Sequence, residues 1–422
     1  MSSPVWHPFT QHGLGEPIPL VARAEGACLF TADGRRIVDA ISSWWVTTHG
    51  HRHPRIMQAI AEQAQKLDQI IFAGWTHEPA EAVARLLVAI LPEPLRHVFF
   101  SDSGSTSVEV ALKMALGYWA NRGEPRHRIL VLDHGYHGDT IGGMSVGARG
   151  VFNAPYAPLL FDVGSLPFPH AGQEQATLDA LDAYCRAPEA PAALIVEPLI
   201  CGAGGMLIYA PEVLAEMRAI CARHRVLFIA DEVMTGWGRT GSLLACQQAG
   251  IVPDILCLSK GLTGGALPLA VTVATPGIFE AHRSDDRAKM FFHSSSYTAN
   301  PIACAAARAN LEIWRDEPVI ERIAALSALQ RTHLDRLAAL PGVRNARSIG
   351  TITALEIGSG NGDYLSALGP RLLAFFGARD LLVRPLGNTI YVMPPYCIDA
   401  ADLAAVHDSI ADAVEWAVQG GS

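Results

Sequence analysis

Residues 226–265 read VLFIADEVMTGWGRTGSLLACQQAGIVPDILCLSKGLTGG, and this stretch decides the class of fold. It contains two short apolar runs, VLFIA and DILCL. Asp231 directly follows the first run, and Lys260 comes shortly after the second. Runs that are apolar throughout are typical of parallel strands whose two faces are both covered by helices. The stretch therefore predicts two strands of an α/β sheet, with a charged side chain at the carboxyl end of each.

The same alternation of short apolar runs and helical patterns extends outward, from about residue 95 to residue 275. Strands are expected at residues 97–100, 128–133, 193–197, 226–231, 254–259 and 269–275. Residues 211–225 begin with proline and place their apolar side chains near one helical face, which predicts a βαβ unit. We expect a large domain built on a mostly parallel sheet flanked by helices.

The pattern changes after about residue 305. Long helical patterns are followed there by separated strands near residues 351–357 and 389–393. This change predicts a smaller α+β domain, which the first fifty or so residues join. The expected division is residues 1–50 with the small domain, 51–304 as the large domain and 305–422 as the C-terminal small domain.

The composition limits the classes of partner. The formal net charge is −9, so the chain has no excess of basic residues to bind nucleic acid or an anionic membrane surface. No apolar run reaches about 18 residues and no basic-then-apolar leader begins the chain, which predicts a cytoplasmic protein.

The charged fraction of only 17% mildly favours a homo-oligomer. The cysteines contain no C-x-x-C pair, and we expect no metal at His49, His51 and His53.

A helix start rich in small polar residues follows the first predicted strand. HVFFSDSGSTSVEVALKMA, residues 97–115, places Ser103, Gly104, Ser105 and Thr106 at the N-terminus of the helix. Free backbone N–H groups and the positive end of the helix dipole suit a phosphate group there. Ordinary helix capping explains the same residues, so this segment indicates a phosphate site only in combination with the residues that follow the other predicted strands.

Two further side chains follow predicted strands. Tyr136, in HGYHGDT, can stack on a flat aromatic cofactor, although core packing would also explain it. Asp231 can pair with a pyridinium nitrogen and keep it protonated, so that the ring draws electrons from a substrate carbanion. A structural or capping aspartate is the alternative.

Lys260 is one of only four lysines, and it alone lies at the carboxyl end of a predicted strand. An amine whose pKa is lowered by burial becomes the nucleophile that imine formation requires. The order of phosphate turn, aromatic ring, strand-end aspartate and strand-end lysine therefore indicates a site for pyridoxal 5′-phosphate (PLP).

The chain resembles the class III, fold type I PLP-dependent aminotransferases over essentially its whole length. DEVMTGWGRTG (residues 231–241), followed by SKGLTGG (residues 259–265), is the most specific match. The resemblance implies a seven-stranded, mostly parallel sheet and a homodimer with shared active sites. It also implies a set of cofactor contacts: Gly104 and Ser105 at the phosphate, Tyr136 on the ring, Asp231 at its nitrogen, Lys260 in the Schiff base, and Ser296, within HSSSYTANP, at the phosphate of the neighbouring subunit.

The resemblance also implies substrate contacts. Arg384, in VRPLG, matches an arginine that binds the carboxylate of the keto substrate. The other matching positions are Trp44, Trp45, Tyr136, Asp139, Arg239 and Phe9. Phe9 stands where the family commonly has a tyrosine, so the chain lacks a hydroxyl at that position.

WHPFT, SSWWVTTHGH, HGYHGDT and IYVMPPY are similar to the branch of the family that acts in biotin biosynthesis. The function this implies is ping-pong transfer of an amino group from S-adenosylmethionine to 8-amino-7-oxononanoate, which gives 7,8-diaminononanoate. Alternatives within the family are a lysine donor or an ω-amino acid:pyruvate reaction. A PLP-dependent decarboxylase or mutase would share the cofactor residues, since these do not choose which bond breaks.

Overall fold

The computed structural model describes residues 3–358 and 368–419. Its centre is a seven-stranded sheet in the order β4-β12-β11-β10-β7-β5-β6, and only β12 runs against the other strands. The strands of this sheet are β4 His97–Ser101, β5 Ile129–Leu132, β6 Gly164–Leu166, β7 Ala193–Val196, β10 Leu227–Asp231, β11 Ile255–Leu258 and β12 Ala270–Ala274. The predicted α/β fold of type I is confirmed, and β6 is the one strand of this sheet that the apolar pattern did not indicate.

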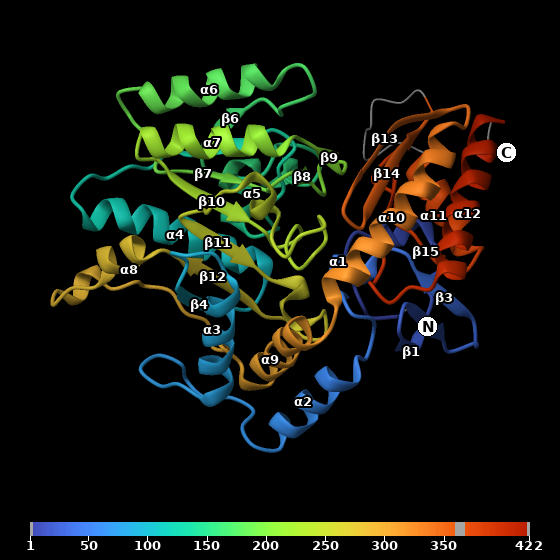
Figure 1. The fold of residues 1–422 in the computed structure, drawn as a ribbon, viewed down its shortest axis with the longest axis horizontal. Helices are drawn as coiled ribbons and strands as arrows, with labels where there is room; N and C mark the ends of the chain where they lie inside the picture. The colour runs from blue at the N-terminus through green and yellow to red at the C-terminus, as the bar shows by residue number, and fades with distance from the viewer. Residues whose placement is uncertain (1–2, 359–367, 420–422) are drawn as a thin grey trace.

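Both faces of this sheet are buried, which is why its strands are apolar throughout. In β5 the side chains of Leu130 and Leu132 belong to one core cluster, whereas those of Ile129 and Val131 belong to another. The first cluster includes residues of α6 (Glu174–Arg186) and α7 (Pro211–Arg223), and the second includes residues of α4 (Gly104–Asn121). Figure 1 shows α6 and α7 together on one side of the sheet and α4 on the other.

The parts of the chain that come before and after the sheet in the sequence form a second body, drawn at the right of Figure 1. Its helices are α10 Val319–Ala338, α11 Leu368–Gly377 and α12 Ala400–Val418. One sheet has the order β1-β2-β3-β15, with β1 Val21–Glu25, β2 Cys28–Thr31, β3 Arg36–Asp39 and β15 Leu381–Leu382. The other has the order β13-β14-β16, with β13 Val343–Ile349, β14 Ile352–Ile357 and β16 Thr389–Val392. Because β3 pairs with β15, the N-terminal strands extend a sheet that the C-terminal part completes.

Helix α9, Pro301–Asp316, joins the two bodies. Cys304 and Leu311 pack in the core of the large sheet, whereas Ala306 and Ile313 pack in the core of the smaller body. The expected boundary between residues 304 and 305 therefore falls inside a helix that serves both cores. The division into domains stays a prediction.

The remaining elements are shorter or peripheral. They are α1 Ser42–Trp45, α2 Pro54–Ala64, α3 Glu78–Ile90, α5 Ile141–Ser145, α8 Pro276–His282 and the hairpin of β8 Ile200–Cys201 and β9 Leu207–Ile208. Within residues 3–358 and 368–419, no helix has both the length and the apolar character that a membrane span requires.

Candidate active site

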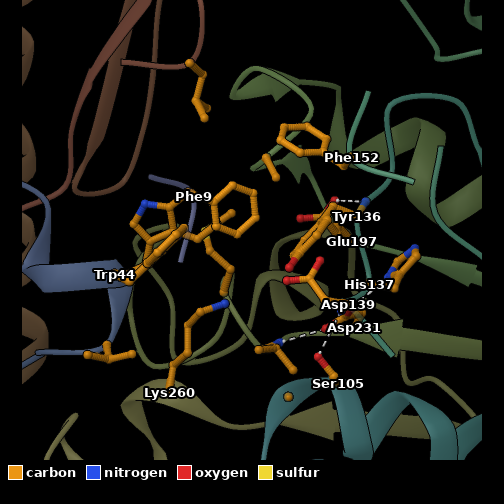
Figure 2. A pocket seen from close by; sticks show the side chains of 18 of the residues that line it. Phe9, Trp44, Ser105, Tyr136, His137, Asp139, Phe152, Glu197, Asp231 and Lys260 are labelled. Carbon is orange, nitrogen blue, oxygen red and sulfur yellow. Dashed lines mark hydrogen bonds and ion pairs between the residues drawn. The ribbon is translucent and has the colours of Figure 1, made fainter. Parts of the chain in front are cut away.

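A cavity of about 410 Å³ lies where the carboxyl ends of β10 and β11 meet residues from the smaller body. Its wall comes from three separate parts of the chain. The residues that line it are Pro8, Phe9, Trp44, Trp45, Val46, Gly104, Ser105, Tyr136, His137, Gly138, Asp139, Phe152, Glu197, Ala203, Asp231, Val233, Met234, Lys260, Arg384, Leu386 and Tyr391. Figure 2 shows the amine of Lys260 pointing into the space between the aromatic rings and the carboxylates.

Lys260 lies just beyond β11, in a tight turn where its own φ is +46°. A left-handed conformation costs a non-glycine residue about 1 kcal/mol, so the surrounding structure must impose it. The amine Nζ lies 5.2 Å from the centroid of the Trp45 ring. Burial lowers the pKa of Lys260, and the charges of Asp231 and Glu197 oppose this shift in part. An amine with a lowered pKa is the nucleophile that the sequence predicted.

Asp231, the last residue of β10, is held by two donors. Its Oδ2 lies 2.7 Å from His137 Nδ1, and its Oδ1 accepts the backbone N–H of Val233 at 3.1 Å. Both side chains are almost fully buried, and His137 Nε2 is a buried nitrogen with no partner within the described residues. The pair fixes the direction of the Asp231 carboxylate at the cavity wall.

The N-terminus of α4 forms one end of the cavity. Ser103 caps this helix in a capping box with Thr106, which leaves the N–H groups of Gly104 and Ser105 at the first turn. A Cβ atom at Gly104 would lie 2.6 Å from Val233 Cγ1, and one at Gly138 would collide with Ser105 Oγ. The Ser105 hydroxyl also accepts the N–H of Asp139 at 3.3 Å. Glycines pack closely around the start of this helix. Because they have no side chains, the backbone there stays accessible to a phosphate group.

Glu197 is a cavity residue that the sequence reasoning did not single out. It is buried, and its two oxygens accept the backbone N–H groups of Tyr136 and Gly202, each at 3.0 Å. Burial raises the pKa of Glu197 to about 7, despite the opposing charge of His137. The carboxylate therefore ties the loop that carries Tyr136 to the turn between β8 and β9. Its position at the end of an apolar strand was the available sequence signal.

The opposite wall is aromatic. The Phe9 ring lies 5.4 Å from that of Trp44 and 6.0 Å from that of Phe152, both at edge-to-face angles. The Arg384 guanidinium lies 5.4 Å from the Trp44 ring, and its Nη2 donates to the Phe9 carbonyl at 3.2 Å. Trp45 is buried, and its Nε1 donates to the Tyr391 hydroxyl at 2.9 Å.

The turn that presents the two tryptophans is strained and is held by a buried carboxylate. Ser42, Ser43 and Trp45 all have positive φ, between 54° and 65°. Asp39 is fully buried, and its oxygens accept the Ser43 N–H at 2.7 and 2.8 Å and lie 2.8 Å from His51 Nε2. These bonds supply the stabilisation that keeps the turn in an unfavourable conformation.

Two predicted site residues lie outside this cavity wall. Arg239 is only 1% exposed, and its guanidinium donates to the carbonyls of Trp45, Thr47 and Pro394. It therefore braces the segment next to Trp45, and its predicted role in substrate binding stays a prediction. Ser296 is exposed, and its carbonyl accepts from Gln69 Nε2 at 2.6 Å. Its contribution to a neighbouring subunit stays a prediction.

The three histidines near residue 50 have separate partners. His49 Nε2 lies 2.9 Å from Asn310 Oδ1, His51 binds Asp39, and His53 Nε2 lies 3.8 Å from Glu317. Across residues 3–358 and 368–419, no group of three potential metal ligands converges.

The cavity fits PLP by the chemistry of its donors. The start of α4 offers backbone N–H groups to a phosphate, Asp231 offers an oriented carboxylate to a pyridine nitrogen, and Lys260 offers an amine. The Lys260 amine lies beside the Trp45 ring, 5.2 Å from its centroid, at the wall of the same cavity. An α/β fold of type I with this site defines a PLP-dependent enzyme.

Comparison with known proteins narrows this class. The family described as "Aminotransferase class-III" matches residues 10–414, so the chain belongs to the class III aminotransferases. The chain is 49% identical to adenosylmethionine-8-amino-7-oxononanoate aminotransferase of Synechococcus elongatus, over 97% of this chain and 98% of that protein. A solved structure of the enzyme of that name from Methanocaldococcus jannaschii has a TM-score of 0.92 at 33% identity and covers 98% of this chain and 97% of its own. An amine transaminase from an uncultivated Pseudomonas species, in a PLP-bound form, has a TM-score of 0.91 at 31% identity, with coverage of 98% and 99%.

Proposed function

We propose that this aminotransferase transfers an amino group from S-adenosylmethionine to 8-amino-7-oxononanoate and so forms 7,8-diaminononanoate for biotin biosynthesis. The observation that carries the proposal is one cavity with the Lys260 amine inside it and Arg384 in its aromatic wall. The names of the similar enzymes supply the identity of the two substrates.

The cofactor side of the proposal assigns one task to each residue. The N–H groups at Gly104 and Ser105 would hold the phosphate, and Tyr136 would pack against the ring. Asp231 would pair with the ring nitrogen, and His137 keeps that carboxylate oriented. When bound, PLP supplies an aldehyde that exchanges with amino groups and a ring that withdraws electrons from the α carbon of the substrate.

Lys260 moves the proton. Its lowered pKa leaves a larger fraction of the amine unprotonated at neutral pH than in an exposed lysine, so Nζ can accept the α proton of the donor. Nζ then holds that proton inside the cavity that contains the substrate.

Arg384 gives the acceptor its orientation. A guanidinium fork binds a carboxylate with two hydrogen bonds, and the carboxylate of 8-amino-7-oxononanoate is separated from its ketone by an aliphatic chain. The apolar rings of Phe9, Trp44 and Phe152 suit that chain. The donor and the acceptor occupy the same cavity in turn, which predicts ping-pong kinetics.

We also propose that the enzyme is a cytoplasmic homodimer in which Ser296 of each subunit binds the phosphate in the other. A dimer face is supported by exposed apolar side chains in the two segments that the Gln69–Ser296 hydrogen bond joins: Ile71, Trp75, Phe292 and Tyr297 are each 63–64% exposed. Eight unpaired cysteines support a reducing compartment. Light scattering of the eluted protein measures the mass, and a monomer would contradict the dimer.

The amino donor is tested by half-reactions. PLP-loaded enzyme is mixed separately with S-adenosylmethionine, lysine and alanine, and the absorbance of the bound cofactor is followed. We expect S-adenosylmethionine to convert the cofactor, and the converted enzyme to yield 7,8-diaminononanoate when 8-amino-7-oxononanoate is added. Conversion by lysine or alanine alone would point instead to the related aminotransferases, and release of carbon dioxide to a decarboxylase.

A further inference from the structure

The turn that carries Lys260 is held at both ends by hydroxyl groups. Just before the lysine, Ser259 Oγ donates to the Leu269 carbonyl at 2.8 Å. At the end of the turn, Thr263 Oγ1 donates to the Leu267 carbonyl at 2.7 Å. Between these two contacts, Lys260 has a φ of +46°, which a residue other than glycine adopts only when its surroundings impose it. The carbonyls of the two residues that follow the lysine are held by a different group.

That group is the side-chain amide of Asn310, in helix α9. Its Nδ2 donates to the carbonyls of Gly261 and Leu262, each at 3.0 Å, and the side chain is fully buried. An amide nitrogen carries two hydrogens, so it can donate both bonds at once. Asparagine is a poor helix former, and a buried amide costs free energy unless it is hydrogen-bonded. The contacts with the turn explain why this residue stands between Ala309 and Leu311 in the middle of α9.

His49 fixes the direction in which this amide points. Its Nε2 lies 2.9 Å from Asn310 Oδ1. Burial lowers the pKa of His49 to about 4, so the ring is neutral at pH 7 and has one N–H group, which Nε2 donates to Oδ1. In the opposite orientation of the amide, Oδ1 would face two carbonyl oxygens. The rings of His53, Trp314 and Tyr396 lie edge-on around His49, at centroid distances of 5.8 to 6.2 Å, and hold it in place.

The two bonds from Asn310 act on the backbone next to the reacting amine. Nζ of Lys260 lies at the end of a flexible four-carbon stem, so a change in the backbone dihedral angles of the turn displaces the amine. A displacement of about 1 Å can lower a reaction rate about 100-fold, because the reacting atoms are no longer aligned. Neither Asn310 nor His49 lines the cavity, so their effect on the reaction passes through the turn.

We propose that Asn310 is a positioning residue for amino transfer: it holds the carbonyls of Gly261 and Leu262 and thereby fixes where Lys260 presents its amine, while His49 orients the amide. The inference rests on the part of the proposed function that assigns proton transfer to Lys260, and it does not depend on which amine is the donor. Because α9 packs in the cores of both bodies, the amine is positioned by the helix that joins them.

The test begins with Asn310→Leu, which keeps the approximate size of the side chain and removes both donated bonds. The first half-reaction is followed in single turnovers of PLP-loaded enzyme, with whichever of S-adenosylmethionine, lysine and alanine converts the cofactor. The maximal rate should fall about 100-fold, and the donor concentration at half-maximal rate should change less than about threefold. The absorbance of bound PLP is also titrated with pH, and its midpoint should shift by at least about half a pH unit, because Nζ then has different surroundings.

His49 offers two milder variants. His49→Leu removes the donor that orients the amide, and it should lower the maximal rate about tenfold. His49→Gln supplies an amide N–H in place of the Nε2–H group, so its rate should stay within about twofold of the unmodified enzyme. A role in overall stability alone would not produce this recovery together with an unchanged donor concentration at half-maximal rate.

Gln330→Met is the matched control. Gln330 is also a fully buried amide, and within the smaller body it donates to the Thr351 carbonyl at 2.6 Å and accepts from Thr353 Oγ1 at 3.0 Å. Its replacement should lower the stability to urea as Asn310→Leu does, since both remove buried hydrogen bonds. The maximal rate and the absorbance midpoint should stay unchanged.

An unchanged rate and midpoint in Asn310→Leu, or the same losses in Gln330→Met, would overturn the positioning role. If Asn310→Leu does not fold, the His49 variants decide: a loss in His49→Leu that His49→Gln restores supports the role, and equal rates in all three proteins overturn it. Losses measured with a donor other than S-adenosylmethionine would leave the positioning role intact and refute only the proposed donor. Absence of PLP attached to Lys260 after borohydride reduction of the unmodified enzyme would refute the assignment of Lys260, and the positioning role with it.

Discussion

Glu197 should make the stability of the protein depend on pH. Its pKa is about 7 in the folded protein, because burial penalises the charged form, against an ordinary value of 4.5. A difference of about 2.5 pKa units corresponds to about 3 kcal/mol. The folded state holds the proton more tightly than the unfolded state. The stabilisation is therefore fully present below pH 4.5 and is lost as the pH rises through 7.

Glu197→Gln removes this titration and keeps the shape of the side chain. The amide oxygen can accept one of the two N–H groups that Glu197 binds, from Tyr136 and Gly202, so the variant loses about 1–3 kcal/mol at every pH. At pH 5 we expect the variant to be less stable than the unmodified enzyme. At pH 8 the difference should shrink or change sign, because only the unmodified enzyme then carries a buried charge.

The assay is urea unfolding of PLP-saturated enzyme at pH 5, 6, 7 and 8, with the two proteins compared at each pH. The difference in unfolding free energy should change by about 3 kcal/mol across this range. Glu25→Gln is the control, because Glu25 is 72% exposed and should give a constant difference. A Glu197→Gln difference that stays constant with pH would refute the assignment of the raised pKa to this residue.

Three further predictions concern the cofactor and the substrates. Lys260→Ala should abolish turnover and leave no PLP attached to the protein after borohydride reduction, with the far-ultraviolet circular dichroism unchanged; full activity would refute its role. Gly138→Ala should weaken PLP binding at least about tenfold in a fluorescence titration, because the new Cβ would collide with Ser105 and the φ of +107° disfavours alanine. An unchanged dissociation constant for PLP would show that the close packing of Gly138 against Ser105 is not needed for cofactor binding. Arg384→Met should raise the KM for 8-amino-7-oxononanoate about 30- to 100-fold, through loss of a charge-assisted hydrogen-bonded pair. The half-reaction with the donor should change much less, and equal losses in both half-reactions would contradict a role limited to the acceptor.

The sequence is informative about the site where function follows from local position. Asp231 and Lys260 each come at or just beyond the carboxyl end of an apolar strand, and a parallel sheet brings such ends to one edge. Ser103 and Gly104 were identifiable in the same way, as the start of an amphipathic helix after a strand. These features depend on only a few neighbouring residues, so the pattern alone located them.

The features whose positions the sequence did not reveal depend mostly on contacts between distant segments. Arg239 belongs to the most specific motif of the chain, yet its guanidinium binds carbonyls of Trp45 and Thr47, more than 190 positions earlier. Phe152 enters the cavity from a loop whose sequence has no helix or strand pattern. Its ring packs against that of Phe9, which is far away in the sequence. Strand β6 has only three residues, too few to show an apolar period.

The order of the cavity residues along the chain has a consequence for synthesis on the ribosome. The groups assigned to the cofactor within one subunit fall between Gly104 and Lys260, whereas Ser296, which is proposed to serve the neighbouring subunit, comes later in the chain. The opposite wall combines Phe9 and Trp44, which emerge first, with Arg384 and Tyr391, which emerge among the last residues. A nascent chain therefore contains these cofactor residues well before it contains Arg384 and Tyr391, and a stalled or truncated product would lack that part of the substrate wall.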